Sequence, residues 1–245
     1  MELLVTFLAG MSMAVGALFV KLFRDPHRLS HASSALALGA MLALALLDLG
    51  PESVGFAREA GAPSALLLVA AGFGLLALLE LFIPDHDDAA AHEHHVSEDA
   101  IEAHIGLISV VALVLHNLVE GMAMYALADV SIQQGAVYAF GVALHNIPMG
   151  MLVFTALRSE RRGVKALALG GALLSTVAGG LVMMLLSGYV SDHVMEMLTC
   201  VAFGMILYIA FVELVPHVVR TRPAWASAVG VACGFALVCV ASLFE

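Results

Sequence analysis

Eight apolar stretches, each close to the length of a membrane-spanning helix, are the feature of this sequence that most restricts its fold. A helix needs about 20 mostly apolar residues to cross the hydrocarbon core of a bilayer. Hydrophobic residues make up 62% of the chain and charged residues 12%, whereas a soluble domain is roughly 45–50% apolar. The sequence therefore predicts an all-α, polytopic membrane protein that forms one domain over residues 1–245. The expected spans are 2–22, 32–50, 63–82, 103–127, 133–157, 164–188, 194–218 and 224–244.

The basic residues indicate how these helices cross the membrane. Nine of the ten lysines and arginines follow the first, fifth or seventh span, and only Arg58 falls on the other side. The side rich in lysine and arginine is normally cytoplasmic. We therefore expect a multi-pass protein of the cell membrane (the inner or plasma membrane) with both termini outside.

The connection at 83–102 should then be cytoplasmic. It contains four of the eleven histidines and seven acids, with no lysine or arginine. A histidine-rich polar tract is typical of loose metal binding. The alternative is a flexible, solvated acidic linker.

Net charge and cysteine content exclude some classes of partner and site. The formal net charge is −10, which does not indicate nucleic acid as a partner. All three cysteines fall inside apolar spans, so they are interpreted as small buried hydrophobic residues and not as a disulfide framework or a thiolate zinc site.

Two similar polar sequences interrupt the fourth and fifth spans near their middles. Residues 116–121 read His-Asn-Leu-Val-Glu-Gly, and residues 145–150 read His-Asn-Ile-Pro-Met-Gly. Polar and ionisable groups are costly in hydrocarbon, so they usually have partners or a task there. The short turn at 128–131 makes the two helices antiparallel neighbours, which places both polar sequences at one depth near the bilayer midplane, where transporter sites tend to lie.

The side chains of these two sequences suit a transition-metal cation. His116 and Glu120 are one helical turn apart and share a face, and so do His145 and Met149. Imidazole, carboxylate, amide oxygen and thioether groups together are plausible ligands for such an ion. The alternative is that each histidine only forms a hydrogen bond between helices.

Two further pairs stand at the ends of other spans. Asp48 and Glu52 end the second span near the outer face, where they could attract a cation to a vestibule. Glu213 and His217 end the seventh span near the inner face and are candidates for an exit station. In both cases the alternative is a charged helix end at the membrane surface.

The chain resembles the ZIP family of divalent-metal transporters, in particular its short bacterial members. The sequence at 116–121 matches the family pattern His-Asn-x-x-acid-Gly, and that at 145–150 is similar to His-Asn-x-Pro-Glu-Gly. The acid-x-x-Pro ends of the second and seventh spans, the histidine-rich loop and the eight-span layout are also similar. The resemblance covers essentially the whole chain.

This resemblance implies a bundle of eight helices in a three-two-three arrangement with inverted repeats. It implies transport of zinc, or of iron, manganese, cadmium and similar cations, usually toward the cytosol. It also implies a central metal centre between the fourth and fifth helices, and an acid of the seventh span, here Glu213, on the inner route. The ligands that the family pattern assigns to the centre are His116, Asn117, Glu120, His145 and Asn146.

Position 149 departs from the family pattern, which has glutamate or a second histidine where this chain has Met149. Two divalent ions at short range repel each other and need carboxylates to offset that repulsion. Glu120 supplies only one negative charge, so we expect a single-ion or weaker centre. Met149 is a candidate soft ligand, and the alternative is that it only packs.

Transport of a divalent cation, with zinc first among the candidates, is thus the function predicted. The protein is not expected to be an enzyme or to hold a cofactor; its partners are the transported cation and the lipid bilayer, and a homodimer is left open. One alternative is an intramembrane metal-dependent hydrolase, against which the absence of a His-Glu-x-x-His sequence argues. The other alternative is a metal sensor of the same fold that does not transport, because of Met149.

Overall fold

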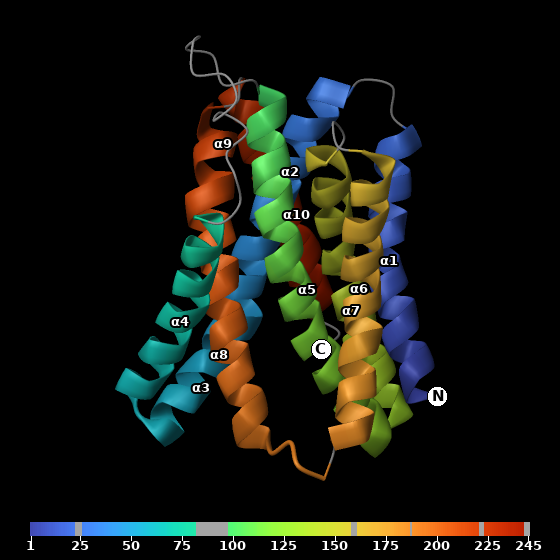
Figure 1. The fold of residues 1–245 in the computed structure, drawn as a ribbon, viewed down its shortest axis with the longest axis vertical. Coiled ribbons are helices and arrows are strands. Elements are labelled where there is room, and N and C mark those ends of the chain that lie inside the picture. Colours follow the sequence, from blue (N-terminus) through green and yellow to red (C-terminus); the bar gives the residue numbers. More distant parts are fainter. Residues whose placement is uncertain (23–25, 82–97, 158–160, 187, 221–222, 243–245) are drawn as a thin grey trace.

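The computed structural model describes residues 1–22, 26–81, 98–157, 161–186, 188–220 and 223–242, and the regular elements in these ranges are helices (Figure 1). Two short π-helical segments, η1 and η3, interrupt the second and seventh spans. The elements are α1 (Glu2–Leu22), α2 (Pro26–Leu44), η1 (Ala45–Leu49), α3 (Gly50–Ala60), α4 (Ala62–Glu80), α5 (Glu98–Val130), α6 (Ile132–Ala156), α7 (Arg162–Leu186), α8 (Asp192–Tyr208), η3 (Ile209–Leu214), α9 (Val215–Arg220) and α10 (Ala224–Ser242).

The predicted class, an all-α polytopic membrane protein, is confirmed. Among the described residues, seven helical stretches are long and apolar enough to cross a membrane, and 224–240 forms a shorter apolar helix. Two spans are longer than predicted: the second continues as helix to Ala60, and α5 already begins at Glu98. The last residues of the predicted loop 83–102 are therefore helical, while its histidines lie outside the described residues.

Each π-helical segment is followed closely by a proline. Pro51 comes two residues after η1, and Pro216 comes two residues after η3. A proline ring clashes with the carbonyl group four residues earlier and provides no N–H for it. Those carbonyls belong to Leu47 and Val212, inside η1 and η3, so we attribute the wider helical turn to the proline that follows.

Glycines allow four pairs of helices to pack backbone against backbone. A Cβ atom at Gly16 in α1 would lie 2.1 Å from the carbonyl oxygen of Ile147 in α6, and one at Gly150 in α6 would lie 2.1 Å from that of Met13 in α1. Small residues permit such approaches in membranes. Three other pairs show the same reciprocal contacts: α5 with α7 (Gly121 and Gly179), α2 with α10 (Gly39 and Gly234), and α4 with α8 (Gly72 and Gly204).

This pairing is the arrangement that an inverted repeat produces. Helix α1 packs on α6 as α7 packs on α5. In the same way, α2 packs on α10 as α8 packs on α4. The two π-helical segments correspond as well, since η1 follows α2 and η3 follows α8. In Figure 1, α3 and α9, which continue these two helices, lie toward opposite ends of the molecule.

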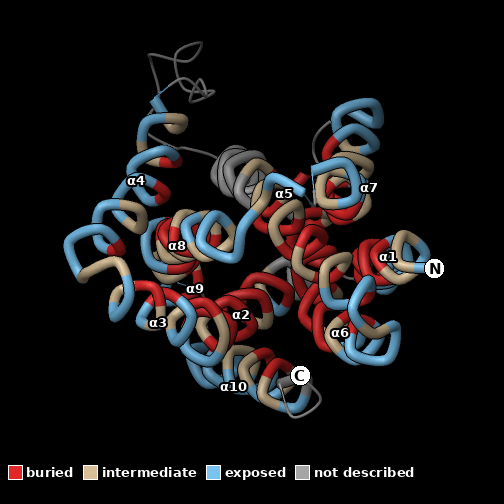
Figure 2. Tube along the Cα trace, turned by 90° about the horizontal axis from the view of Figure 1, so that it is seen from below, coloured by how far each residue is buried: buried red, intermediate tan, exposed pale blue. Residues whose placement is uncertain are grey.

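The helices form two bundles that meet along α5 and α6. One bundle contains α1, α5, α6 and α7; the other contains α2, α3, α4, α8, α9 and α10. In the end-on view of Figure 2, buried residues gather where the bundles meet, and exposed residues face outward on α4 and α7. Many of the exposed residues are large and apolar, as Leu67 (71% exposed) and Leu167 (79%) illustrate, which suits contact with lipid.

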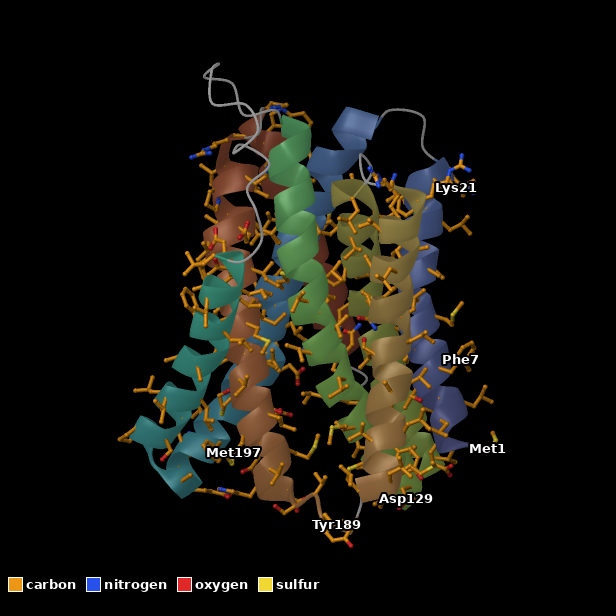
Figure 3. All side chains as sticks on the ribbon, in the orientation of Figure 1. Met1, Phe7, Lys21, Asp129, Tyr189 and Met197 are labelled. Carbon is orange, nitrogen blue, oxygen red and sulfur yellow. The ribbon has the colours of Figure 1, made fainter. Side chains whose placement is uncertain are left out.

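Labelled residues in Figure 3 show which segments lie at each end of the molecule. Lys21 lies at one end in Figure 3, whereas Met1, Asp129 and Tyr189 lie toward the other. The predicted topology also places Lys21 at the end opposite to Met1 and Asp129, and it assigns the end with Lys21 to the cytoplasm. The sidedness itself, with both termini outside, stays a prediction.

Candidate metal centre

Helices α5 and α6 bring the two histidines of the paired sequences onto one carboxylate. The Nε2 atoms of His116 and His145 lie 2.9 Å and 2.8 Å, respectively, from the same oxygen of Glu120, Oε1. The two imidazole rings have centroids 6.1 Å apart and are tilted by 43°. One potential ligand atom from each of the three side chains lies within 4.8 Å of the others, which is compact enough to hold a metal ion.

These three side chains are almost completely buried. His116, His145 and Glu120 are 2%, 3% and 4% exposed, within helices that are long and apolar enough to span a membrane. A carboxylate removed from water in this way needs a positive partner or strong hydrogen bonds. A divalent cation bound between the carboxylate and the two imidazoles would be such a partner.

Asn117 is held through its amide nitrogen, and its amide oxygen is without a hydrogen-bond partner in the described chain. Its amide nitrogen donates to the carbonyl oxygen of Ala172 in α7, at 3.1 Å, and to the sulfur of Met13 in α1, at 3.4 Å. Both partners are acceptors, so they fix which end of the amide is nitrogen. The oxygen, Oδ1, is buried and has no hydrogen-bond partner within the described chain, and a metal ion is a suitable partner for such an atom.

Other polar atoms near this cluster are also buried without a hydrogen bond. Among the described residues, both amide atoms of Asn146 and the second oxygen of Glu120, Oε2, have no hydrogen-bond partner. Leaving a buried polar group unsatisfied costs roughly 1–3 kcal/mol. A cation with its remaining water molecules would satisfy several of these groups at once.

Replacing Asn117 with aspartate is expected to destabilise the metal-free protein by about 1–3 kcal/mol, because an oxygen would then face the carbonyl oxygen of Ala172 in place of a donor. The matched control is Asn146→Asp, which adds the same buried charge but breaks no hydrogen bond to a described residue. Thermal unfolding in detergent without metal measures the difference. Equal losses for the two variants would contradict this account of Asn117.

Met149 is fully inside the protein. It is 2% exposed and belongs to the main hydrophobic core, together with Met13 and Leu152. This placement fits the packing role, and the role of a sulfur ligand stays a prediction. Met149 adds no charge, so Glu120 is the only carboxylate in the compact cluster that the described residues form.

The two remaining candidates, Glu213 and His217, are not part of the cluster of three. Glu213 is buried within η3, whereas His217 is half-buried on α9. The prediction that they share a helical face assumed regular α-helical spacing, which η3 does not have. The ring of His217 instead lies 5.9 Å from that of His31 in α2.

Sequence reasoning missed several polar contacts of the buried side chains. Met13 and Ala172 hold Asn117, and both look like ordinary packing residues in apolar spans. Tyr208 in α8 donates a hydrogen bond to Glu80 at the end of α4. A polar residue within an apolar span was the available signal for Tyr208, but nothing in the sequence indicated its partner.

The fold and this cluster define an integral membrane protein with a buried site suited to a divalent cation. The family described as ZIP Zinc transporter matches residues 83–242, which is more than half of the chain, and the chain therefore belongs to the ZIP family. It is similar to the zinc transporter ZupT of Escherichia coli, with 27% identity over 250 residues that cover 96% of this chain and 93% of that protein. It is likewise similar to the zinc transporter ZupT of Stenotrophomonas maltophilia, with 28% identity covering 95% of this chain and 91% of that protein.

Proposed function

We propose that this chain carries divalent transition-metal cations, Zn²⁺ above all, across the cell membrane toward the cytosol. The observation that supports this most directly is the convergence of His116, Glu120 and His145 within contact distance inside membrane-spanning helices. Nitrogen and carboxylate ligands are the ones zinc prefers. Membership of the ZIP family and the names of the two relatives agree with the proposal.

The protein is expected to replace part of the hydration shell of the ion at this centre. The imidazoles of His116 and His145 and the carboxylate of Glu120 would bind the ion, and the amide oxygens of Asn117 and Asn146 would complete its surroundings. Imidazole and carboxylate groups must lose their protons to bind a metal. Binding of the ion is therefore a competition with protons for these groups, and uptake should fall at acidic pH.

The pairs at the ends of the second and seventh spans would form the route to and from the centre. Asp48 and Glu52 lie on the outer side, and Glu213 and His217 lie toward the inner side in the proposed orientation.

Zinc flux into proteoliposomes tests the proposal. Vesicles that contain the purified protein and a zinc-sensitive dye should load Zn²⁺ at a saturable rate, well above that of protein-free vesicles. Magnesium outside the vesicles should compete poorly, because it prefers oxygen ligands and keeps its water. Zinc loading no faster than in protein-free vesicles would overturn the proposal and would favour the sensor hypothesis.

A further inference from the structure

Four basic side chains belong to two neighbouring helix ends in the bundle that contains α1 and α7. Lys21 lies in the last turn of α1, at one end of the molecule (Figure 3). Arg161 comes directly before α7, and Arg162 and Lys165 lie in its first turn. Neither the last turn of α1 nor the sequence 161–165 contains an acid, so the charge of these segments is purely positive.

The packing of α1 against α7 sets the height at which these charges meet. A Cβ atom at Gly10 would lie 2.5 Å from the carbonyl oxygen of Leu173, and one at Gly180 would lie 3.0 Å from the Cγ2 atom of Thr6. The two helices are therefore antiparallel. Lys21 comes eleven residues after Gly10, and α7 begins eleven residues before Leu173. Because the rise per residue is the same in both helices, this register brings Lys21 level with the first turn of α7.

Three of these cations have no anionic partner in the described chain. Lys21, Arg161 and Arg162 are exposed, and none of them forms an ion pair with another described residue. Like charges at one place repel each other and together attract an anion. The ends of α1 and α7 therefore suit a negatively charged ligand.

Large apolar side chains lie on the same two helices beside these cations. Leu18 and Leu22 on α1 are 56% and 72% exposed, and Leu167 on α7 is exposed as well. Both helices are long and apolar enough to cross a membrane. Basic residues that border such an apolar surface extend their charged groups to the level of the lipid headgroups. A phospholipid would contact both surfaces, whereas a soluble anion would contact only the cations.

We propose that the ends of α1 and α7 form a binding site for the headgroup of an anionic phospholipid. The side chains of Lys21, Arg161, Arg162 and Lys165 would contact the phosphate oxygens, to which guanidinium groups can donate paired hydrogen bonds. The acyl chains would lie along the exposed leucines of both helices. The lipid would thus stabilise the contact of α1 with α7, and this inference is independent of the proposed transport function.

The test measures how phospholipids stabilise the purified full-length protein in detergent micelles. Thermal unfolding is followed while phosphatidylglycerol, which is anionic, or phosphatidylcholine, which has no net charge, is added at increasing mole fraction. Glycerol phosphate is the third probe, because it offers the phosphate without acyl chains. The test variant combines Lys21→Gln with Arg162→Gln. The matched control combines Arg58→Gln with Arg220→Gln, which removes two exposed cations from α3 and α9.

Phosphatidylglycerol should raise the unfolding temperature of the unmodified protein more than phosphatidylcholine does, because it binds the folded state. The test variant should need about tenfold more phosphatidylglycerol, or above, for half of this stabilisation, since each basic residue near an anionic lipid surface contributes about fivefold in affinity. The control should change this amount by less than about twofold, because α3 and α9 lie toward opposite ends of the molecule and outside the site. High salt should weaken the effect of phosphatidylglycerol on the unmodified protein.

Several results would overturn this inference. One is equal stabilisation of the unmodified protein by the two phospholipids, and another is an equal loss of stabilisation in the test variant and the control. Stabilisation by glycerol phosphate at the same concentration as phosphatidylglycerol would show that the site binds a soluble phosphate and not a lipid. If the test variant does not fold, Lys21→Gln alone replaces it, with an expected loss of about fivefold. Zinc flux, measured separately, decides the proposed function whichever result is obtained here.

Discussion

Replacing Glu120 with glutamine should reduce zinc flux to the level of protein-free vesicles. The substitution keeps the size of the side chain but removes the oxygen charge that lies 2.8–2.9 Å from both imidazoles. At a separation of about 3 Å and an effective dielectric constant near 20, one carboxylate attracts a divalent ion by on the order of 10 kcal/mol before desolvation costs. If only about 3 kcal/mol of this attraction remains after the desolvation costs, its loss weakens zinc binding by at least about a hundredfold.

Zinc loading of proteoliposomes and chelator competition in detergent measure this effect. Glu59→Gln is the control, since it removes a carboxylate from an exposed part of α3. His145→Ala tests the same cluster from α6 and should also abolish rapid flux. If vesicles with Glu120→Gln load zinc within about twofold of the unmodified protein, a carboxylate with so large an attraction for the ion is not at the centre and the assignment is wrong.

The second large effect is expected at Gly179 in α7. A Cβ atom there would lie 2.0 Å from the carbonyl oxygen of Leu118, which belongs to the polar sequence at 116–121. Backbone cannot move aside as a flexible side chain can, so Gly179→Ala must push α5 and α7 apart. We expect a loss of stability of about 1–3 kcal/mol or more, as overpacking usually costs, together with weaker zinc binding.

Gly170→Ala in the same helix is the matched control. A Cβ at Gly170 meets no atom within 4 Å, so this change only adds a methyl group and some helix propensity. It should be neutral or slightly stabilising, by up to about 1 kcal/mol. Thermal unfolding of both variants in detergent makes the comparison; equal behaviour would show that the close contact of α5 with α7 is not needed for stability.

Much of the fold follows from the sequence because the bilayer permits few alternatives. Long apolar stretches separated by short connections determine the spans, and the first span, Glu2–Leu22, has the predicted bounds. The meeting of His116 and His145 was also predictable, because a short turn joins their helices and both stand near mid-span. Pattern and length decide these features, and neither depends on side-chain detail.

The remaining features depend on the height at which one helix packs against another, which the hydrophobic pattern of the sequence does not determine. The contact of Met13 with Asn117 requires α1 to lie at one height against α5, and the close glycine–carbonyl contacts of α1 with α6 and α7 help to determine that height. The π-helical segments change the angle between Asp48 and Glu52 and between Glu213 and His217, although the prolines beside them were visible in the sequence.

The reciprocal glycine contacts also bear on how the chain reaches its final form during synthesis. Three helices from the first third of the chain pack closely on helices that are synthesised later: α1 on α6, α2 on α10 and α4 on α8. A Cβ atom at Gly39 in α2 would meet the carbonyl oxygen of Val231 in α10, which is synthesised much later. Helix α2 must therefore remain in the lipid, inserted but without this neighbour, until α10 has been synthesised. A chain that stops before residue 224 would insert normally yet leave α2 with an open, glycine-lined face, and such a product is a natural target for membrane proteases.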